Sequence, residues 1–161
     1  AGFMLLCVAL LIGPLTMLWP KHFALLIEPR RAVGLATFTF IILHAILATA
    51  LYFNWDFAKL LSFLPLSIGA AATFIFLLLA ATSTDYAVKT LGVWWKRLHK
   101  LNYLAFLLAF VHFIFQAQVV SGKRPLNYVE MLLLALGVVV VIMQIVGFIT
   151  VRKRLAKTAP G

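Results

Sequence analysis

Five long apolar stretches alternate along the chain with short polar or basic connections. A helix needs about 20 mostly apolar residues to cross the hydrocarbon core of a bilayer, and each stretch approaches or exceeds that length. Since a helix satisfies its own backbone hydrogen bonds in lipid, the pattern predicts an all-α membrane protein, a bundle of about five transmembrane helices. The predicted helices cover residues 3–19, 32–52, 66–82, 96–117 and 128–150.

Proline, glycine and small residues add local detail to this pattern. Pro14 follows Gly13 inside the first helix and predicts a kink, because proline removes one backbone hydrogen bond. Gly69 and the three alanines after it would let a neighbouring helix or a flat macrocycle approach closely, and helix packing is the simpler interpretation. Residues 86–91 predict a short interfacial helix that ends at Gly92.

Composition predicts a single transmembrane domain over residues 1–161. The chain is 65% hydrophobic, its mean hydropathy is +1.09, and its length leaves no room for a separate soluble domain. The net charge of +10 does not indicate nucleic-acid binding, because the basic residues cluster at helix ends, where the lipid surface accounts for them. Cys7, the only cysteine, is expected to be a small core or lipid-facing residue. The chain opens at Ala1 rather than at a methionine, so we expect further residues upstream.

The distribution of lysine and arginine predicts the orientation of the chain. With five helices across the membrane, eleven of the 14 basic residues fall on one face, and Lys59, Lys123 and Arg124 fall on the other. Cytoplasmic loops carry the excess of lysine and arginine, so the face with eleven is assigned to the cytoplasm. The prediction is a multi-pass protein with its N-terminus outside and its C-terminus in the cytoplasm.

Two histidines lie inside predicted spans, where ionisable side chains are costly and are functional candidates by default. His44 lies 13 residues beyond Arg31, and His112 lies 12 residues beyond Lys100. At 1.5 Å per residue, both lie roughly 20 Å from the inner basic residues, in the outer half of the bilayer. Two imidazoles at matched depth could ligate one haem iron from both sides, between the second and fourth helices. The alternative is two isolated histidines that bond to threonine or carbonyl groups.

His99 lies near the inner surface, and two interpretations of it stay open. The second helix offers no histidine at that level, only Arg31. On an ideal helix His99 and His112 point roughly 140° apart, so they share no face unless the helix is distorted. His99 either ligates a second, inner haem with an unidentified partner or is an interfacial histidine beside Lys100. The fourth histidine, His22, is expected to be an exposed surface residue.

Other catalytic templates do not occur in the sequence, which has no Walker loop, no GxSxG and no CxxC motif. The four acidic residues lie at helix ends, so no chain of carboxylates crosses the membrane. Gln144, the one strongly polar residue deep in the last predicted helix, either bonds to a neighbouring helix or binds a quinone. These observations favour an electron-transfer subunit that has no substrate site of its own. The competing hypothesis is a non-redox scaffold or assembly subunit with vestigial histidines.

Several motifs resemble the ferric reductase-like transmembrane domain family, and most closely its MsrQ-type haem-binding membrane subunits. The similarity covers residues 11–118, and it includes the two-part signature TST…LG..W..LH…H, which is more specific than any single histidine. The matching segments are residues 13–15, 30–35, 81–84 and 91–99, with His44 and His112 downstream of the second and fourth.

The resemblance implies one or two b-type haems in a protein of the bacterial inner membrane. The haem-site residues and iron ligands that it implies are His44, His99 and His112. If His99 ligates an inner haem, the propionates could pair with a basic ring of Arg31, Arg97 and Lys100. In that family electrons come from a cytoplasmic flavin reductase or the quinone pool and leave to a periplasmic molybdenum enzyme. Such subunits usually have six spans, and this chain is expected to lack the first.

Overall fold

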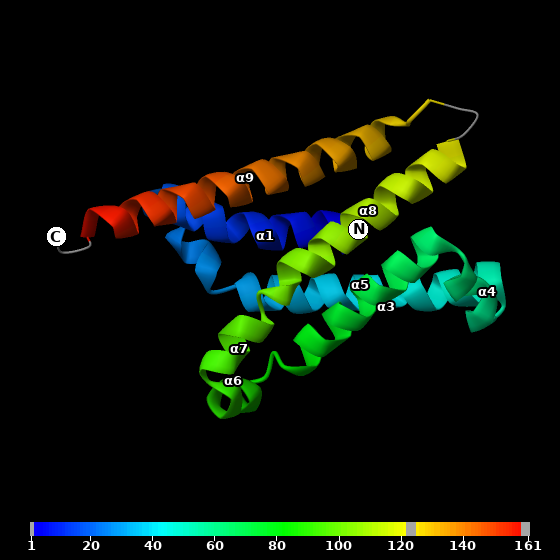
Figure 1. Ribbon diagram of the computed structural model, residues 1–161, viewed down its shortest axis with the longest axis horizontal. Helices are drawn as coiled ribbons and strands as arrows, with labels where there is room; N and C mark the ends of the chain where they lie inside the picture. Colours follow the sequence, from blue (N-terminus) through cyan, green and yellow to red (C-terminus); the bar gives the residue numbers. More distant parts are fainter. Residues whose placement is uncertain (1, 122–124, 159–161) are drawn as a thin grey trace.

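The computed structural model describes residues 2–121 and 125–158, and every element in these ranges is a helix. Five helices are long: α1 (Gly2–Leu18), α3 (Arg30–Phe53), α5 (Leu64–Ala81), α8 (Leu101–Ser121) and α9 (Tyr128–Thr158). Shorter elements join them: α2 (Pro20–Phe23), the 3₁₀ turn η1 (Ala24–Ile27), α4 (Phe57–Ser62), α6 (Asp85–Leu91) and α7 (Val93–Leu98). Successive long helices run in opposite directions along the molecule (Figure 1).

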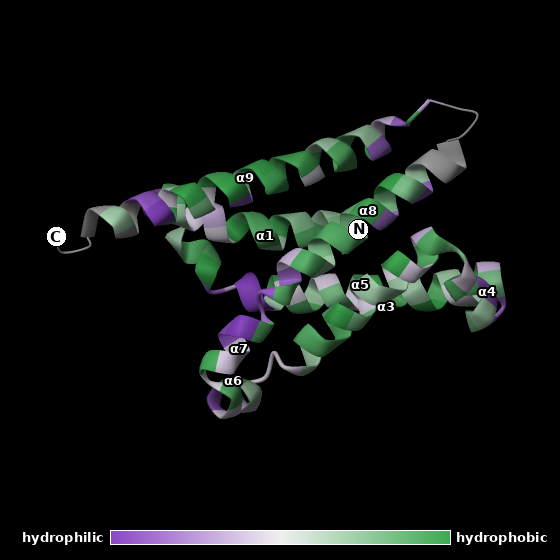
Figure 2. Cartoon of the chain, in the orientation of Figure 1, coloured by the Kyte–Doolittle hydropathy of each residue, from purple (hydrophilic) through white to green (hydrophobic). Residues whose placement is uncertain are grey.

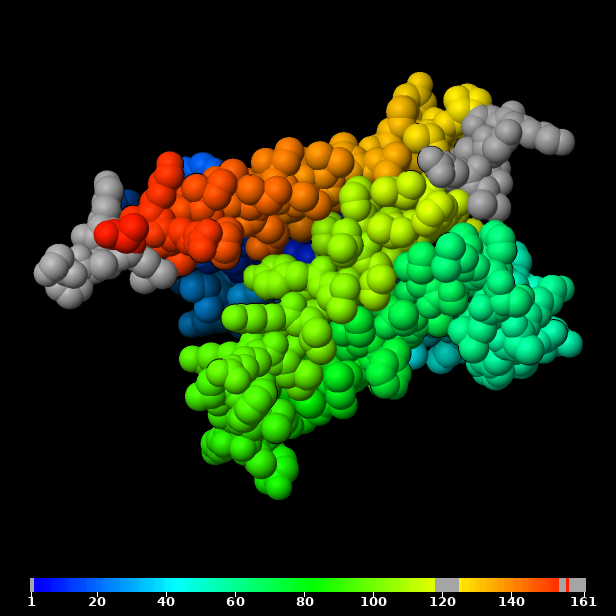
Figure 3. Space-filling model, in the orientation of Figure 1, coloured from blue at the N-terminus to red at the C-terminus, as the bar shows by residue number. Residues whose placement is uncertain are grey.

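Two helices, α1 and α5, organise the packing of the others. α1 lies against α3 and α9, and α5 lies against α8 in the most extensive helix pair of the molecule. α8 separates α9 from α5 on the surface that Figure 3 shows. α6 and α7 project from the bundle at the end where α5 stops and α8 begins (Figure 1).

The buried core is small and apolar, and it comes from four of the long helices. Its residues are Leu6, Cys7, Leu10, Ala72, Phe76, Ala105, Phe106 and Val140. Cys7 is completely buried there, so it is a core residue rather than a lipid-facing one. Many large apolar side chains are exposed instead, and the visible faces of the long helices are hydrophobic (Figure 2). In a membrane these faces contact lipid.

The predicted fold class, an all-α membrane protein, is confirmed. Four described segments are long and apolar enough to cross a bilayer: Arg30–Phe53, Leu64–Ala81, Val93–Ala117 and Tyr128–Lys153. α1 is a shorter apolar helix of 17 residues. At 1.5 Å per residue α1 is about 26 Å long, close to the lower limit for a membrane span. The chain is a multi-pass membrane protein.

The structure divides the fourth predicted helix, residues 96–117, into two helices. α7 ends at Leu98, and α8 begins at Leu101. Between them the backbone amides of Asn102 and Tyr103 bond to carbonyls three residues back, as in a 3₁₀ turn, instead of four. From the sequence alone, His99 and His112 can share a face only if the helix between them is distorted. This 3₁₀ turn is such a distortion.

Other boundaries lie close to the prediction. α9 continues to Thr158, eight residues beyond the predicted end at 150, so the basic tail extends the last helix. The short helix predicted over residues 86–91 is confirmed as α6, with Thr84 as its N-cap, and its location at the membrane interface stays a prediction. Gly92 ends it with a φ of +50°, a conformation that favours glycine. In the predicted external loop, residues 122–124 lie outside the described part of the chain.

A hydrogen bond between α9 and α1 explains the polar residue in the last helix. Pro14 has no N–H, so it cannot donate the intrahelical bond that the Leu10 carbonyl would ordinarily accept. The Gln144 side-chain amide donates to this carbonyl at 2.7 Å. Gly147, one helical turn further along α9, faces Pro14, and a Cβ atom at this position would lie 3.7 Å from the Pro14 Cβ atom. Of the two interpretations of Gln144, the structure supports bonding to a neighbouring helix.

Gln144→Leu is expected to destabilise the protein by about 1 kcal/mol, because it leaves the Leu10 carbonyl unpaired in apolar surroundings. In a Pro14→Ala background the amide of residue 14 can bond to that carbonyl, so the same change should cost less. Unfolding of all four variants in detergent measures this coupling. Equal costs of Gln144→Leu in both backgrounds would show that the proline has no part in the contact.

Candidate functional site

His112 is held against α5 at a position that only a glycine leaves open. Its Nδ1 atom lies 2.7 Å from the carbonyl oxygen of Pro65, in the first turn of α5. A Cβ atom added to Gly69 would lie 2.7 Å from the same Nδ1 atom, well inside contact distance. The small-residue patch that begins at Gly69 therefore serves helix packing, as the simpler interpretation predicted, and it accommodates the His112 ring.

The hydrogen bond to Pro65 assigns the tautomer of His112. A carbonyl oxygen can only accept, so the proton of the neutral ring must sit on Nδ1. Nε2 then carries an unshared lone pair, and a metal ion would bind to this atom. Metal-ligating histidines typically donate their other ring N–H to a carbonyl or carboxylate, and this bond fixes the ring orientation. His112 thus has the hydrogen-bond arrangement of a metal ligand.

Aromatic stacking between α1 and α8 sets the rotation of α8 about its axis. Phe3 of α1 stacks on Phe106, Phe110 and Phe113, with ring centroids 5.4–6.0 Å apart. These rings place one face of α8 against α1, and the neighbouring face, which carries His112, lies against α5. The direction of the His112 ring is therefore determined by packing on both sides of α8.

His44 lies on α3 with an exposed side chain, and both its helix and the helix of His112, α8, pack against α5. Within the described chain the His44 imidazole has no hydrogen-bond partner. An unpaired polar group inside a membrane span is costly unless something satisfies it. Each of the two histidines has a ring nitrogen that no described residue occupies, and their matched depth stays a prediction.

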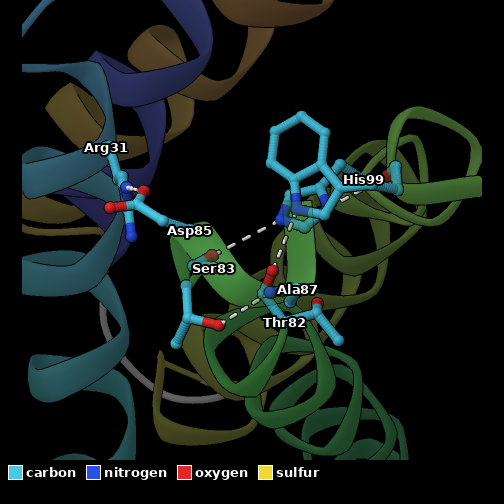
Figure 4. A network of polar contacts seen from close by, with 8 residues as sticks. Arg31, Thr82, Ser83, Asp85, Ala87 and His99 are labelled. Carbon is cyan, nitrogen blue, oxygen red and sulfur yellow. Dashed lines mark hydrogen bonds and ion pairs between the residues drawn. The ribbon is translucent and has the colours of Figure 1, made fainter. Parts of the chain in front are cut away.

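His99 belongs to a polar network at the opposite end of α8 (Figure 4). Its ring stacks on Trp95 at a centroid distance of 4.0 Å, with Nδ1 3.2 Å from the Trp95 carbonyl and Nε2 3.4 Å from Ser83 Oγ. The Trp95 indole N–H donates to the Thr82 carbonyl at 2.9 Å. The two halves of the sequence signature, TST and W..LH, thus contact each other in the folded chain.

The hydrogen bonds around neutral His99 leave the lone pair of its Nε2 atom unshared. Ser83 Oγ donates its proton to the Leu79 carbonyl at 2.7 Å, so it has no proton for the imidazole. When Nδ1 of His99 donates to the Trp95 carbonyl, Nε2 is left with an unshared lone pair beside Ser83 Oγ. This arrangement is compatible with both interpretations, an iron ligand and an interfacial histidine, and His99 stays a prediction.

The three cations of the predicted basic ring lie in different surroundings. Arg31, at the start of α3, forms an ion pair with Asp85 at the start of α6 (Figure 4). The Arg97 guanidinium lies over the Trp94 ring, 4.7 Å from its centroid. Lys100 is exposed in the turn between α7 and α8. His22, the fourth histidine, is exposed on α2, as predicted.

Sequence patterns did not point to the partners of the candidate histidines. Nothing in the sequence pairs His112 with the Pro65 carbonyl or Arg31 with Asp85, because these contacts join residues more than 40 positions apart. One signal was available: a proline inside a helix leaves the carbonyl four residues earlier without a donor, and this points to Leu10 as a partner for a polar residue.

Comparison with known proteins places this arrangement in a family. Residues 1–110 match the family model described as "Ferric reductase like transmembrane component". The chain belongs to the ferric reductase-like transmembrane family. Residues of the signature network, together with His44, lie inside the matched region, and His112 follows two residues after it.

Curated relatives of this ferric reductase-like chain include several haem-binding subunits of bacterial methionine sulfoxide reductases, each called MsrQ. The chain is 31% identical to the subunit of Pasteurella multocida over 148 residues, which cover 86% of this chain and 69% of the relative. It is 30% identical to that of Agrobacterium fabrum, covering 82% and 61%, and 34% identical to that of Cronobacter sakazakii, covering 86% and 67%. This chain therefore spans about two thirds of the length of these relatives. No solved structure matches it.

Proposed function

We propose that this chain is a membrane electron-transfer subunit that binds b-type haem, with His44 and His112 as axial ligands of an outer haem between α3 and α8. The observation that carries the proposal is the His112 tautomer, since the bond from Nδ1 to the Pro65 carbonyl leaves Nε2 free to ligate iron. The relatives named as haem-binding subunits support the choice of cofactor.

The residues present fit this cofactor better than a bare metal ion. No cluster of three or more histidine, cysteine, aspartate or glutamate side chains suited to a metal ion occurs in the described parts of the chain. Haem needs only two axial ligands from the protein, because the porphyrin supplies the others. His44 and His112 provide two imidazoles, and each has a ring nitrogen that no described residue occupies.

Each group around the site has a definable task in this proposal. When bound, haem supplies reversible one-electron chemistry at its iron. The Pro65 carbonyl orients the His112 ring and raises the basicity of Nε2. Gly69 leaves room for that ring, and the stacked phenylalanines hold α8 at the rotation that directs His112 toward α5.

The test of the proposal is a reduced-minus-oxidised absorption spectrum of the purified protein, with the haem counted chemically. A b-type spectrum with at least one haem per chain is expected. Protein that folds and inserts in the presence of haem but purifies without it would favour the competing hypothesis, a non-redox scaffold or assembly subunit.

Partners and substrates follow from the relatives only as proposals. By analogy with subunits named for methionine sulfoxide reductase, we propose that electrons leave to a separate reductase subunit, expected on the periplasmic side of the bacterial inner membrane. The donor in this proposal is a cytoplasmic flavin reductase or a membrane quinol. An outer haem alone favours the quinol, because it lies far from the cytoplasmic surface.

The proposed orientation places the C-terminus in the cytoplasm, because eleven of 14 basic residues fall on that side. A reporter fused after Gly161 is expected to read as cytoplasmic, and one inserted in the loop over residues 121–127 as external. The opposite pair of signals would reverse the proposed direction of electron flow.

We extend the proposal to His99 as a ligand of a second, inner haem. Of the cations at this level, Arg31 is paired with Asp85, whereas Arg97 and Lys100 have no ion-pair partner in the described chain and are available to a propionate. His99→Ala is expected to lower the haem content per chain and to leave the outer haem spectrum in place. His99→Ala protein that keeps its full haem content would make His99 an ordinary interfacial histidine.

A further inference from the structure

A groove with a volume of about 520 Å³ lies on the projection formed by α6, α7 and the start of α8. Its lining residues are Leu91, Trp94, Arg97, Leu98 and Leu101. Four of these five side chains are apolar, and the only charged one is Arg97. The groove is shallow and open rather than enclosed, so a ligand can enter from the side. It is separate from the His44–His112 pair and does not depend on haem.

Arg97 is held in place at this groove by Trp94. The guanidinium lies 4.7 Å from the centroid of the indole ring, a cation–π distance. This stacking restricts a side chain that is otherwise flexible, and it leaves the N–H groups of the guanidinium available at its edge. The described chain offers Arg97 no carboxylate, since the ion pair of this region joins Arg31 to Asp85. An anion therefore has a preorganised and unneutralised partner at the groove.

The charge around the groove is strongly one-sided. Lys89, Lys96 and Lys100 are exposed within a dozen residues of Arg97, and none of them has an ion-pair partner in the described chain. The single acidic residue of this stretch, Asp85, is already bound to Arg31. The potential at the groove is positive, so its complement is a negatively charged ligand.

The groove combines this charge with exposed apolar surface. Val93 and Trp94 are 69% and 67% exposed. Hydrophilic residues lie along α6, α7 and the start of α3 (Figure 2). Exposed tryptophan beside lysine and arginine is typical of the headgroup level of a membrane. A soluble anion would satisfy the charge and leave the leucines exposed.

We propose that the groove binds an anionic phospholipid. Its phosphate pairs with the Arg97 guanidinium through two N–H groups, and its acyl chain lies along Leu91, Leu98 and Leu101. The phospholipid thereby neutralises the charge of Arg97 and covers the apolar side chains of the groove. An acidic peptide would need donors and acceptors for its backbone, and the groove lining offers few polar atoms for them.

The test uses the full chain purified in detergent and incubated with equal amounts of phosphatidylglycerol and phosphatidylcholine, followed by native mass spectrometry. The expected result is preferential retention of phosphatidylglycerol. Arg97→Gln should reduce this preference about fivefold, the effect of one basic residue at an anionic surface. Trp94→Ser, at a side chain that is 67% exposed, should leave the fold intact and weaken the same preference, because it frees Arg97.

The matched control is Lys89→Gln, which removes the same charge from the same projection without touching the groove lining. It is expected to keep the preference for phosphatidylglycerol. An equal loss in Lys89→Gln and Arg97→Gln would mean general surface attraction and would overturn the proposal. An Arg97→Gln protein that retains the lipid but loses haem would also overturn the proposal, since Arg97 would then bind the cofactor. An Arg97→Gln protein with the lipid preference of the wild type would overturn it as well.

Discussion

Replacing either His44 or His112 with alanine is expected to abolish the low-spin b-type spectrum of the outer haem. Iron with two imidazole ligands becomes high-spin or dissociates when one is removed, so each single variant should have the full effect. Much of the fold should survive. His44 makes no hydrogen bond to the described chain, and loss of the His112 ring costs one bond to the Pro65 carbonyl. The measurement is the reduced-minus-oxidised spectrum, with haem counted per chain.

His22→Ala is the control for this pair, because His22 is an exposed histidine on α2 outside the proposed site. It should keep both the spectrum and the haem content. Unchanged spectra in both His44→Ala and His112→Ala would refute the assignment of the ligands. A change in one variant alone would show that the two imidazoles do not share an iron.

A methyl group added at Gly69 is expected to disturb the haem site from a distance. The Cβ atom of alanine there would lie 2.7 Å from Nδ1 of His112, so the ring or the helix must move. The ring cannot shift cheaply, since its Nδ1 atom bonds to the Pro65 carbonyl at 2.7 Å. Overpacking of this kind typically costs about 1–3 kcal/mol. We expect Gly69→Ala to lower thermal stability and to reduce or broaden the haem absorption bands.

Gly34→Ala provides the matched control in another long helix. A Cβ atom at Gly34 meets nothing within 4 Å, so alanine should stabilise α3 by up to about 1 kcal/mol through its higher helix propensity. A lower melting temperature for Gly69→Ala and a higher one for Gly34→Ala would support the packing argument. If Gly69→Ala melts like Gly34→Ala and has an unaltered haem spectrum, Gly69 does not position His112.

The positions of the long helices were predictable because membrane insertion depends on local properties of the sequence. Each span needs only enough consecutive apolar residues, and this can be counted along the chain. The end of α6 at Gly92 and its N-cap at Thr84 are local for the same reason, since they depend on single residues at a helix end. The break between α7 and α8 was missed, because no proline or glycine marks it. It lies at His99 and Lys100, between the end of α7 at Leu98 and the start of α8 at Leu101.

The sequence by itself determined that this chain is a helical membrane protein, since length and hydropathy are enough for that, and the matched depth of His44 and His112 stays a prediction. Only the tertiary structure decided which atoms these histidines offer. The Pro65 carbonyl comes from another helix, and it decides that His112 presents Nε2. Likewise Leu10 is the partner of Gln144 because α9 packs on α1 at Pro14. Contacts between distant segments depend on helix rotation and distance, which a linear pattern does not encode.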